Sequence, residues 1–161
     1  MEHTEDARTD SPTRREFCTH ACQTVSLLTM AAFVQACGSP TSADSVDAPA
    51  LPTVSGSPIA GGVTVAAGAS SPLASVGSAA LVQSSAGNFL VSRSSTTTFV
   101  ALTAVCTHQG CTVSEFESPN YVCPCHGSRY NLNGGVVQGP ATSSLRQFTT
   151  DFTNGVVTIH T

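Results

Sequence analysis

The chain has 161 residues, a formal net charge of −4 at pH 7 and no lysine. This weakly acidic balance argues against nucleic-acid binding, which requires a basic surface. The length predicts one domain with flanking tails, and the abundance of Ser, Thr, Val and Gly favours short strands and turns over helices.

Residues 1–37 have the features of a targeting segment. Arg14 and Arg15 precede a short apolar run at 25–34. This arrangement resembles a twin-arginine export signal, and the run is shorter than the roughly 20 apolar residues that span a membrane. We therefore expect export by the twin-arginine route, which moves folded proteins. The alternative is a surface helix that happens to contain two arginines.

Cys37 follows the apolar run, in the sequence Val-Gln-Ala-Cys. An aliphatic residue, a small residue and then Cys resembles a bacterial lipoprotein processing site, at which Cys37 would become the lipidated first residue. In the alternative, the segment is never cleaved and stays as a membrane anchor. Both alternatives tether the chain to the outer face of the cytoplasmic membrane, on the periplasmic side.

Residues 38–58 are predicted to form a flexible linker. Prolines are scattered there among Ser, Ala, Thr and Gly, and such a composition cannot bury enough apolar surface to offset the entropy of ordering. A tether of about 20 residues has an r.m.s. span of roughly 25 Å, so the domain that follows could move between partners.

Residues 59–161 are predicted to form an all-β domain of small antiparallel sheets. Short apolar or alternating runs are separated by turn signals, and no stretch shows a 3.6-residue apolar period. The pair Asn154-Gly155 predicts a tight turn within a closing hairpin. The candidate strands are 62–66, 80–83, 89–92, 98–105, 112–116, 121–122, 129–131, 145–151 and 156–160.

Two six-residue boxes carry the chemistry, at 106–111 (CTHQGC) and 123–128 (CPCHGS). Each begins with Cys, has a His two or three positions later and contains a further Cys. Thiolates and imidazoles from two loops can surround a metal centre. A zinc site is an alternative, but it does not need the two additional cysteines. A pure disulfide scaffold leaves the histidines unexplained, and copper would more naturally include a methionine.

This pair of boxes resembles the Rieske family, in its cytochrome bc complex-like branch, and the resemblance is strong over 105–141. It implies a Rieske-type fold with a cluster-binding part of two loops. It also implies a [2Fe-2S] cluster with two Cys on one iron and two His on the other. The implied ligands are Cys106, His108, Cys123 and His126. The remaining cysteines, Cys111 and Cys125, would form a disulfide between the two loops.

The resemblance also assigns roles to neighbouring residues. Ser128 would donate a hydrogen bond to a bridging sulfide, and Tyr130 would donate one to the sulfur of Cys106. Such bonds raise a reduction potential because they stabilise the added negative charge of the reduced state. The alternative for Tyr130 is core packing. Residues 139–141 resemble the proline loop that covers the cluster in related proteins.

The implied function is one-electron transfer, with no catalysis by the chain alone. A free imidazole nitrogen could take up a proton as the electron arrives, which suits quinol oxidation, and His126 is the candidate contact. We expect a membrane-tethered carrier whose partner is a cytochrome or a periplasmic oxidoreductase. The alternative is the iron–sulfur subunit of a quinol–cytochrome c oxidoreductase-type complex. An oxygenase component is disfavoured because the chain has no room for a second, catalytic domain.

Overall fold

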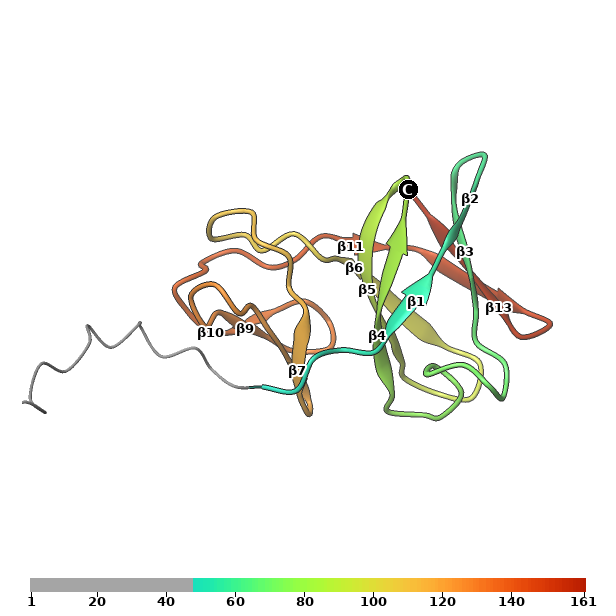
Figure 1. Cartoon of the computed structure of the whole chain (residues 1–161), viewed down its shortest axis with the longest axis horizontal. Helices are drawn as coiled ribbons and strands as arrows, with labels where there is room; N and C mark the ends of the chain where they lie inside the picture. The colour runs from blue at the N-terminus through green and yellow to red at the C-terminus, as the bar shows by residue number, and fades with distance from the viewer. Residues whose placement is uncertain (1–47) are drawn as a thin grey trace, which may run out of the picture. The chain divides into compact units, whose positions relative to one another are not determined.

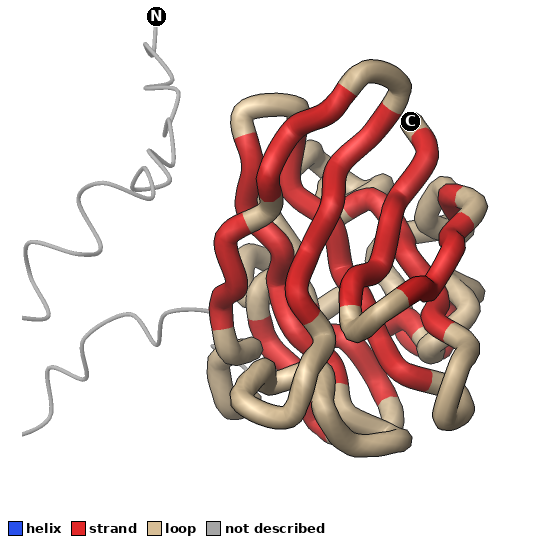
Figure 2. The backbone as a smooth tube through the Cα atoms, turned by 90° about the vertical axis from the view of Figure 1, so that its right-hand side faces the viewer, coloured by secondary structure: helices blue, strands red, loops and turns tan. Residues whose placement is uncertain are grey.

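The computed structural model describes residues 48–161, so the features predicted at Arg14, Arg15 and Cys37 lie outside it. Every regular element in the described range is a strand, as Figure 2 shows. No helix there is long and apolar enough to cross a membrane. The prediction of an all-β fold is confirmed.

Thirteen short strands make up the described part of the chain. In chain order they are β1 (Thr53–Ser55), β2 (Ser57–Ile59), β3 (Gly62–Ala66), β4 (Ala79–Ser84), β5 (Gly87–Arg93), β6 (Phe99–Thr103), β7 (Glu115–Glu117), β8 (Asn120–Val122), β9 (Arg129–Tyr130), β10 (Val136–Gln138), β11 (Gln147–Phe148), β12 (Thr150–Thr153) and β13 (Val156–His160).

The strands form three small sheets. A five-stranded sheet has the order β1-β4-β5-β6-β11, and two four-stranded sheets have the orders β10-β9-β8-β7 and β12-β13-β3-β2. All pairs are antiparallel except β1 with β4, which is parallel. Figure 1 shows β7, β9 and β10 on one side of the domain, β3 and β13 on the other, and β4, β5 and β6 between them.

The three central strands of the five-stranded sheet, β4, β5 and β6, are buried on both faces. Along β5, Phe89 and Val91 pack into one apolar core with β3 and β13, whereas Leu90 packs into a second core. The same alternation holds in β4, where Val82 and Leu81 lie in opposite cores, and in β6, where Ala101 and Leu102 do. Side chains alternate between the faces of a strand, so a sheet covered on both sides needs nearly continuous apolar runs.

The closing hairpin matches its predicted turn. Strands β12 and β13 pair from Thr150 with Ile159 to Thr153 with Val156. Asn154 and Gly155 between them have φ values of 52° and 78°. Positive φ at both central positions is the requirement of a type I′ turn, which explains the Asn-Gly pair.

The prediction that the linker runs to residue 58 is wrong. Strand β1 pairs with β4, and β2 pairs with β3. Leu51 is buried among the residues of the second core, and its amide donates to the carbonyl of Ser114 at 2.8 Å. The few apolar side chains of this segment are enough to keep it ordered, because the edges of two sheets supply hydrogen-bond partners for its backbone. A composition rich in Pro and Ser concealed this pairing.

Truncating Leu51 should therefore destabilise the domain. A buried leucine that is shortened to alanine leaves a cavity and costs about 2–5 kcal/mol, whereas a residue in a flexible linker would cost nothing. We expect Leu51→Ala to lower the free energy of unfolding in chemical denaturation by an amount in this range. The matched control is Ile59→Ala on β2, where the side chain is 48% exposed. Equal effects of the two substitutions would contradict the assignment.

Tyr121 on β8 gives the domain a pH-dependent stability. Burial raises the pKa of its hydroxyl to about 12 from 10.0, an effect that the neighbouring Ser92 hydroxyl reduces. The pKa of Tyr121 is higher in the folded state than in the unfolded state. The free energy of unfolding should therefore keep the full contribution of the protonated Tyr121 below pH 10 and lose it as the pH rises from 10 to about 12. The loss should be about 2–3 kcal/mol.

Alkaline unfolding of Tyr121→Phe tests this expectation. Without an ionisable hydroxyl, the unfolding free energy of the variant should fall less steeply between pH 10 and pH 12 than that of the native chain. Measuring denaturant unfolding at several pH values gives both slopes. Identical slopes would show that Tyr121 does not titrate with this linkage.

Candidate metal centre

The two boxes fold into loops with the same hydrogen-bond pattern. In the first box the amide of Cys106 donates to the carbonyl of Cys111 at 2.8 Å, and the amide of Gly110 donates back to Cys106 at 2.9 Å. In the second box Cys123 pairs with Ser128 and Gly127 with Cys123 at the same offsets, at 2.9 and 3.0 Å. The two boxes are therefore conformational copies of one another.

A glycine at the fifth position of each box makes this loop possible. Gly110 has a φ of 75° and Gly127 a φ of 73°. Residues other than glycine rarely adopt this left-handed backbone conformation. The equal spacing of glycine in the two boxes is thus explained by the backbone rather than by ligand chemistry.

The first cysteine of each box is a buried free thiol. Cys106 is 3% exposed and Cys123 is 1% exposed, and neither forms a disulfide. Both belong to the second core, which also contains Leu90 and Leu102 of the five-stranded sheet. The two thiols lie close enough for each to influence the ionisation of the other. The base of the site is therefore sulfur-rich and apolar.

The two histidines lie together on the solvent side. The ring centroids of His108 and His126 are 4.8 Å apart with an interplanar angle of 86°. His126 is exposed and His108 is half-buried. The Nδ1 atom of His108 is shielded from solvent and has no hydrogen-bond partner among the described residues. A buried nitrogen of this kind needs a hydrogen-bond partner or a metal ion.

The ionisation of the two thiols is shifted in opposite directions. Burial opposes the ionisation of Cys106, but hydrogen bonds, that of Tyr130 foremost, hold the pKa of its thiol below the ordinary value. Burial, followed by the interaction with Cys106, raises the pKa of Cys123 to about 11. Two adjacent thiolates repel each other in a low-dielectric site, so a cation is needed to hold both in the ionised form.

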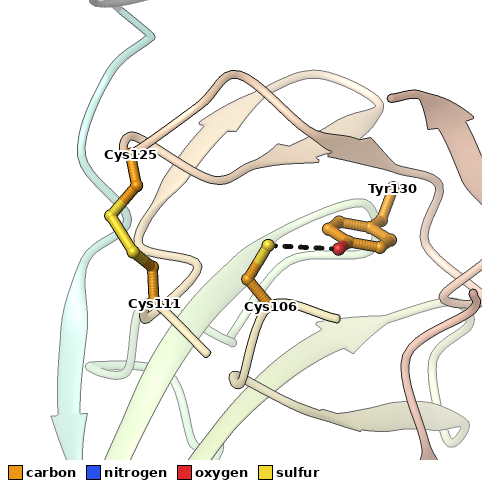
Figure 3. The surroundings of a disulfide bond; sticks show 4 residues. All are labelled: Cys106, Cys111, Cys125 and Tyr130. Carbon is orange, nitrogen blue, oxygen red and sulfur yellow. Dashed lines mark hydrogen bonds between the residues drawn. A yellow bond between two sulfur atoms is a disulfide. The ribbon is translucent and has the colours of Figure 1, made fainter. Parts of the chain in front are cut away.

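Cys111 and Cys125 form a disulfide that joins the two loops, as predicted. Figure 3 shows this bridge beside Cys106 and Tyr130. The sulfurs of Cys111, Cys125 and Cys123 all lie within 4.8 Å of one another. The disulfide therefore lies beside the Cys123 sulfur and limits the distance between the loops that carry the histidines.

Ser128 and Tyr130 both lie beside the sulfurs. The hydroxyl of Tyr130 is 3.3 Å from the sulfur of Cys106, and the Tyr130 side chain is fully buried. The hydroxyl of Ser128 accepts a hydrogen bond from the amide of Ala141 at 3.0 Å, which leaves its own proton free to be donated. It also contributes to lowering the pKa of Cys106. Its donation to a bridging sulfide stays a prediction.

Thr107 is a site residue that the sequence did not indicate. Its amide and its hydroxyl lie 3.2 and 3.0 Å from the hydroxyl of Tyr130. The hydroxyl also donates to the carbonyl of Ser143 at 2.6 Å. A threonine between two predicted metal ligands has no distinguishing pattern, and only the fold brings Ser143 and Tyr130 to it.

The donor set fits an iron–sulfur cluster. Two buried thiols suit one iron, and two imidazole rings at the surface suit a second iron, one of them with a nitrogen that lacks a partner. Among the described residues, Cys106 and Cys123 lie in the second core, and the rings of His108 and His126 contact each other; their joint ligation of a cluster stays a prediction.

Comparison with known proteins agrees with this chemistry. The family model described as Rieske [2Fe-2S] domain matches residues 64–149, which include both boxes. The chloroplastic cytochrome b6-f complex iron-sulfur subunit of Pisum sativum is 49% identical over 57 residues, or 35% of this chain and 25% of that protein. The corresponding subunit of Chlamydomonas reinhardtii is 46% identical over 74 residues, or 45% of this chain and 36% of that protein.

One similar solved structure is the plasma membrane Rieske protein PetC3 from Synechocystis PCC 6803. It has 26% sequence identity and a TM-score of 0.46, and the match covers 52% of this chain and 86% of that one. The b6-f subunits are matched over a much smaller share, so the chain spans only 25–36% of the length of those two relatives.

Removing the disulfide should loosen the site. A bridge that closes a loop of about 15 residues stabilises a fold by roughly 3 kcal/mol, since it restricts the unfolded chain. We expect the double variant Cys111→Ala/Cys125→Ala to lose about this much free energy of unfolding, measured in denaturant. Dithiothreitol should lower the stability of the native chain and leave that of the double variant unchanged. A double variant as stable as the native chain would contradict this role.

Proposed function

The chain belongs to the Rieske [2Fe-2S] family, and we propose that it transfers single electrons through a cluster bound between its two cysteine–histidine loops. The proposed ligands are Cys106, His108, Cys123 and His126. One observation carries this assignment. Two buried free thiols and two imidazole rings in contact with each other come from the same two loops, and the Nδ1 of His108 is buried without a partner among the described residues.

The cluster supplies a one-electron redox couple, and the chain determines how readily it is reduced. Neutral imidazoles in place of two thiolates make the site less negative, so the addition of an electron costs less. The hydroxyls of Tyr130 and Ser128 stabilise negative charge on the sulfurs. Burial of the sulfur side keeps water away, while the exposed His126 leaves a short path for an electron to a partner.

The exposed histidine also offers a place for a proton. An imidazole that binds metal through one nitrogen keeps the other nitrogen available to solvent or to a ligand. The arrival of negative charge nearby favours protonation of that nitrogen. Coupled uptake of an electron and a proton suits the oxidation of a quinol, and we assign the contact to His126.

In this proposal the chain is an exported, membrane-tethered carrier that serves a cytochrome or a periplasmic oxidoreductase. The sequence features at Arg14, Arg15 and Cys37 support export and tethering. The disulfide supports them independently, because disulfides persist mainly in oxidising compartments. The second candidate is the iron–sulfur subunit of a quinol-oxidising complex, which the names of the b6-f relatives favour. Co-purification with a b-type cytochrome would favour the second candidate.

Electron paramagnetic resonance of the dithionite-reduced protein tests the cluster. We expect a rhombic signal with a low average g value, which is typical of mixed Cys and His ligation, together with two irons and two sulfides per chain. His126→Ala should abolish this signal and lower the iron content. The matched control is His160→Ala, since His160 lies on β13 and pairs with Asp151. A silent protein that contains stoichiometric zinc would overturn the proposal.

A further inference from the structure

The hydroxyl of Tyr130 lies among three atoms of the first box. The sulfur of Cys106 is 3.3 Å away, the amide nitrogen of Thr107 is 3.2 Å away, and the hydroxyl oxygen of Thr107 is 3.0 Å away. Tyr130 is fully buried, so water does not compete for its hydroxyl. The hydrogen bonds of this group are therefore decided by the protein alone.

The number of protons available determines the direction of each bond. A carbonyl oxygen only accepts, so the single proton of the Thr107 hydroxyl is given to Ser143, at 2.6 Å. Towards Tyr130 the Thr107 oxygen can then act only as an acceptor. The amide of Thr107 can only donate, and it occupies a lone pair of the Tyr130 oxygen.

Tyr130 consequently has one proton and two acceptors. The sulfur of Cys106 is one acceptor and the hydroxyl oxygen of Thr107 is the other, and the oxygen is the nearer of the two. A proton shared between two acceptors stabilises each less than an undivided hydrogen bond would. The two protons of Thr107 do not remove this competition, because the amide proton is directed at the Tyr130 oxygen and the hydroxyl proton at the carbonyl of Ser143.

We propose that Thr107 is a positioning residue that draws the proton of Tyr130 away from the Cys106 sulfur and so lowers the reduction potential of the site. This inference rests on the proposed function. Donation to a sulfur stabilises the reduced state, so withdrawal of part of that donation makes reduction less favourable. The carbonyl of Ser143, which follows the 139–141 loop, maintains the effect because it holds the Thr107 proton.

Two substitutions at Thr107 separate its hydroxyl from its shape. Thr107→Val removes the hydroxyl and keeps the branched shape, so the Tyr130 proton goes entirely to Cys106 and the midpoint potential should shift upwards. Thr107→Ser keeps the hydroxyl, and its potential should equal that of the native chain. Thr107→Ala should shift upwards like Thr107→Val, and it serves if the valine variant does not fold. The potentials are measured by redox titration followed by electron paramagnetic resonance.

A double-substitution cycle with Tyr130→Phe isolates the proposed route. Tyr130→Phe should lower the potential, and adding Thr107→Val in that background should produce no upward shift, because there is no phenolic proton left to redirect. An unchanged or lowered potential in Thr107→Val, or a shift of equal size in the Tyr130→Phe background, would overturn the inference. If the variants keep the rhombic signal, either of these results refutes only the role of Thr107. If the native chain itself lacks the rhombic signal, the proposed function is refuted.

Discussion

Burial of the three central strands of the five-stranded sheet on both faces is the constraint on which the rest of the molecule depends. Alternate residues of β4, β5 and β6 enter opposite cores, so that Phe89 supports the β3–β13 side and Leu90 supports the metal centre. Each four-stranded sheet on the flanks buries its apolar residues against this central sheet. The central sheet therefore supports both flanking sheets. The two loops pack against it because Cys106 and Cys123 lie in the second core together with residues of the central sheet.

The geometry of the metal centre depends on the central sheet and on two loops that have the same backbone hydrogen bonds. Each box closes through the same pair of backbone hydrogen bonds and turns at a glycine with positive φ, so the two first cysteines enter the core in equivalent ways. The disulfide then connects the two loops beside the sulfurs. Rigid positioning of this kind reduces the rearrangement that accompanies a change of charge, which favours rapid electron transfer.

Polarity changes sharply across the site. Apolar residues and hydrogen-bond donors surround the sulfurs on the inner side, whereas His126 faces solvent on the outer side. Negative charge is thus stabilised by fixed dipoles in a dry environment, where such dipoles are most effective. The hydroxyl of Tyr130 is one of these dipoles, and it lies within hydrogen-bond distance of both the Cys106 sulfur and the Thr107 hydroxyl.

Much of this protein follows from its sequence because the signals are local. The alternating and continuous apolar runs of β3, β5 and β13, the Asn154-Gly155 turn and the two boxes all depend on neighbouring residues, and the prediction of a disulfide between Cys111 and Cys125 is confirmed. Local patterns of this kind reflect backbone geometry and ligand chemistry, which act over a few residues.

Tertiary structure decided what depends on distant partners. Strands β1 and β2 lie in a segment whose composition predicts a linker, and they form because β4 and β3 offer free edges. Strand β10 pairs with β9 without a clear pattern of its own. The roles of Thr107 and Ser143 likewise arise only when residues 36 positions apart in the chain meet. The sequence by itself thus determined the fold class and predicted the set of candidate metal ligands, whereas the extent of the domain and the hydrogen-bond partners of Thr107 and Tyr130 were decided by contacts that no local pattern encodes.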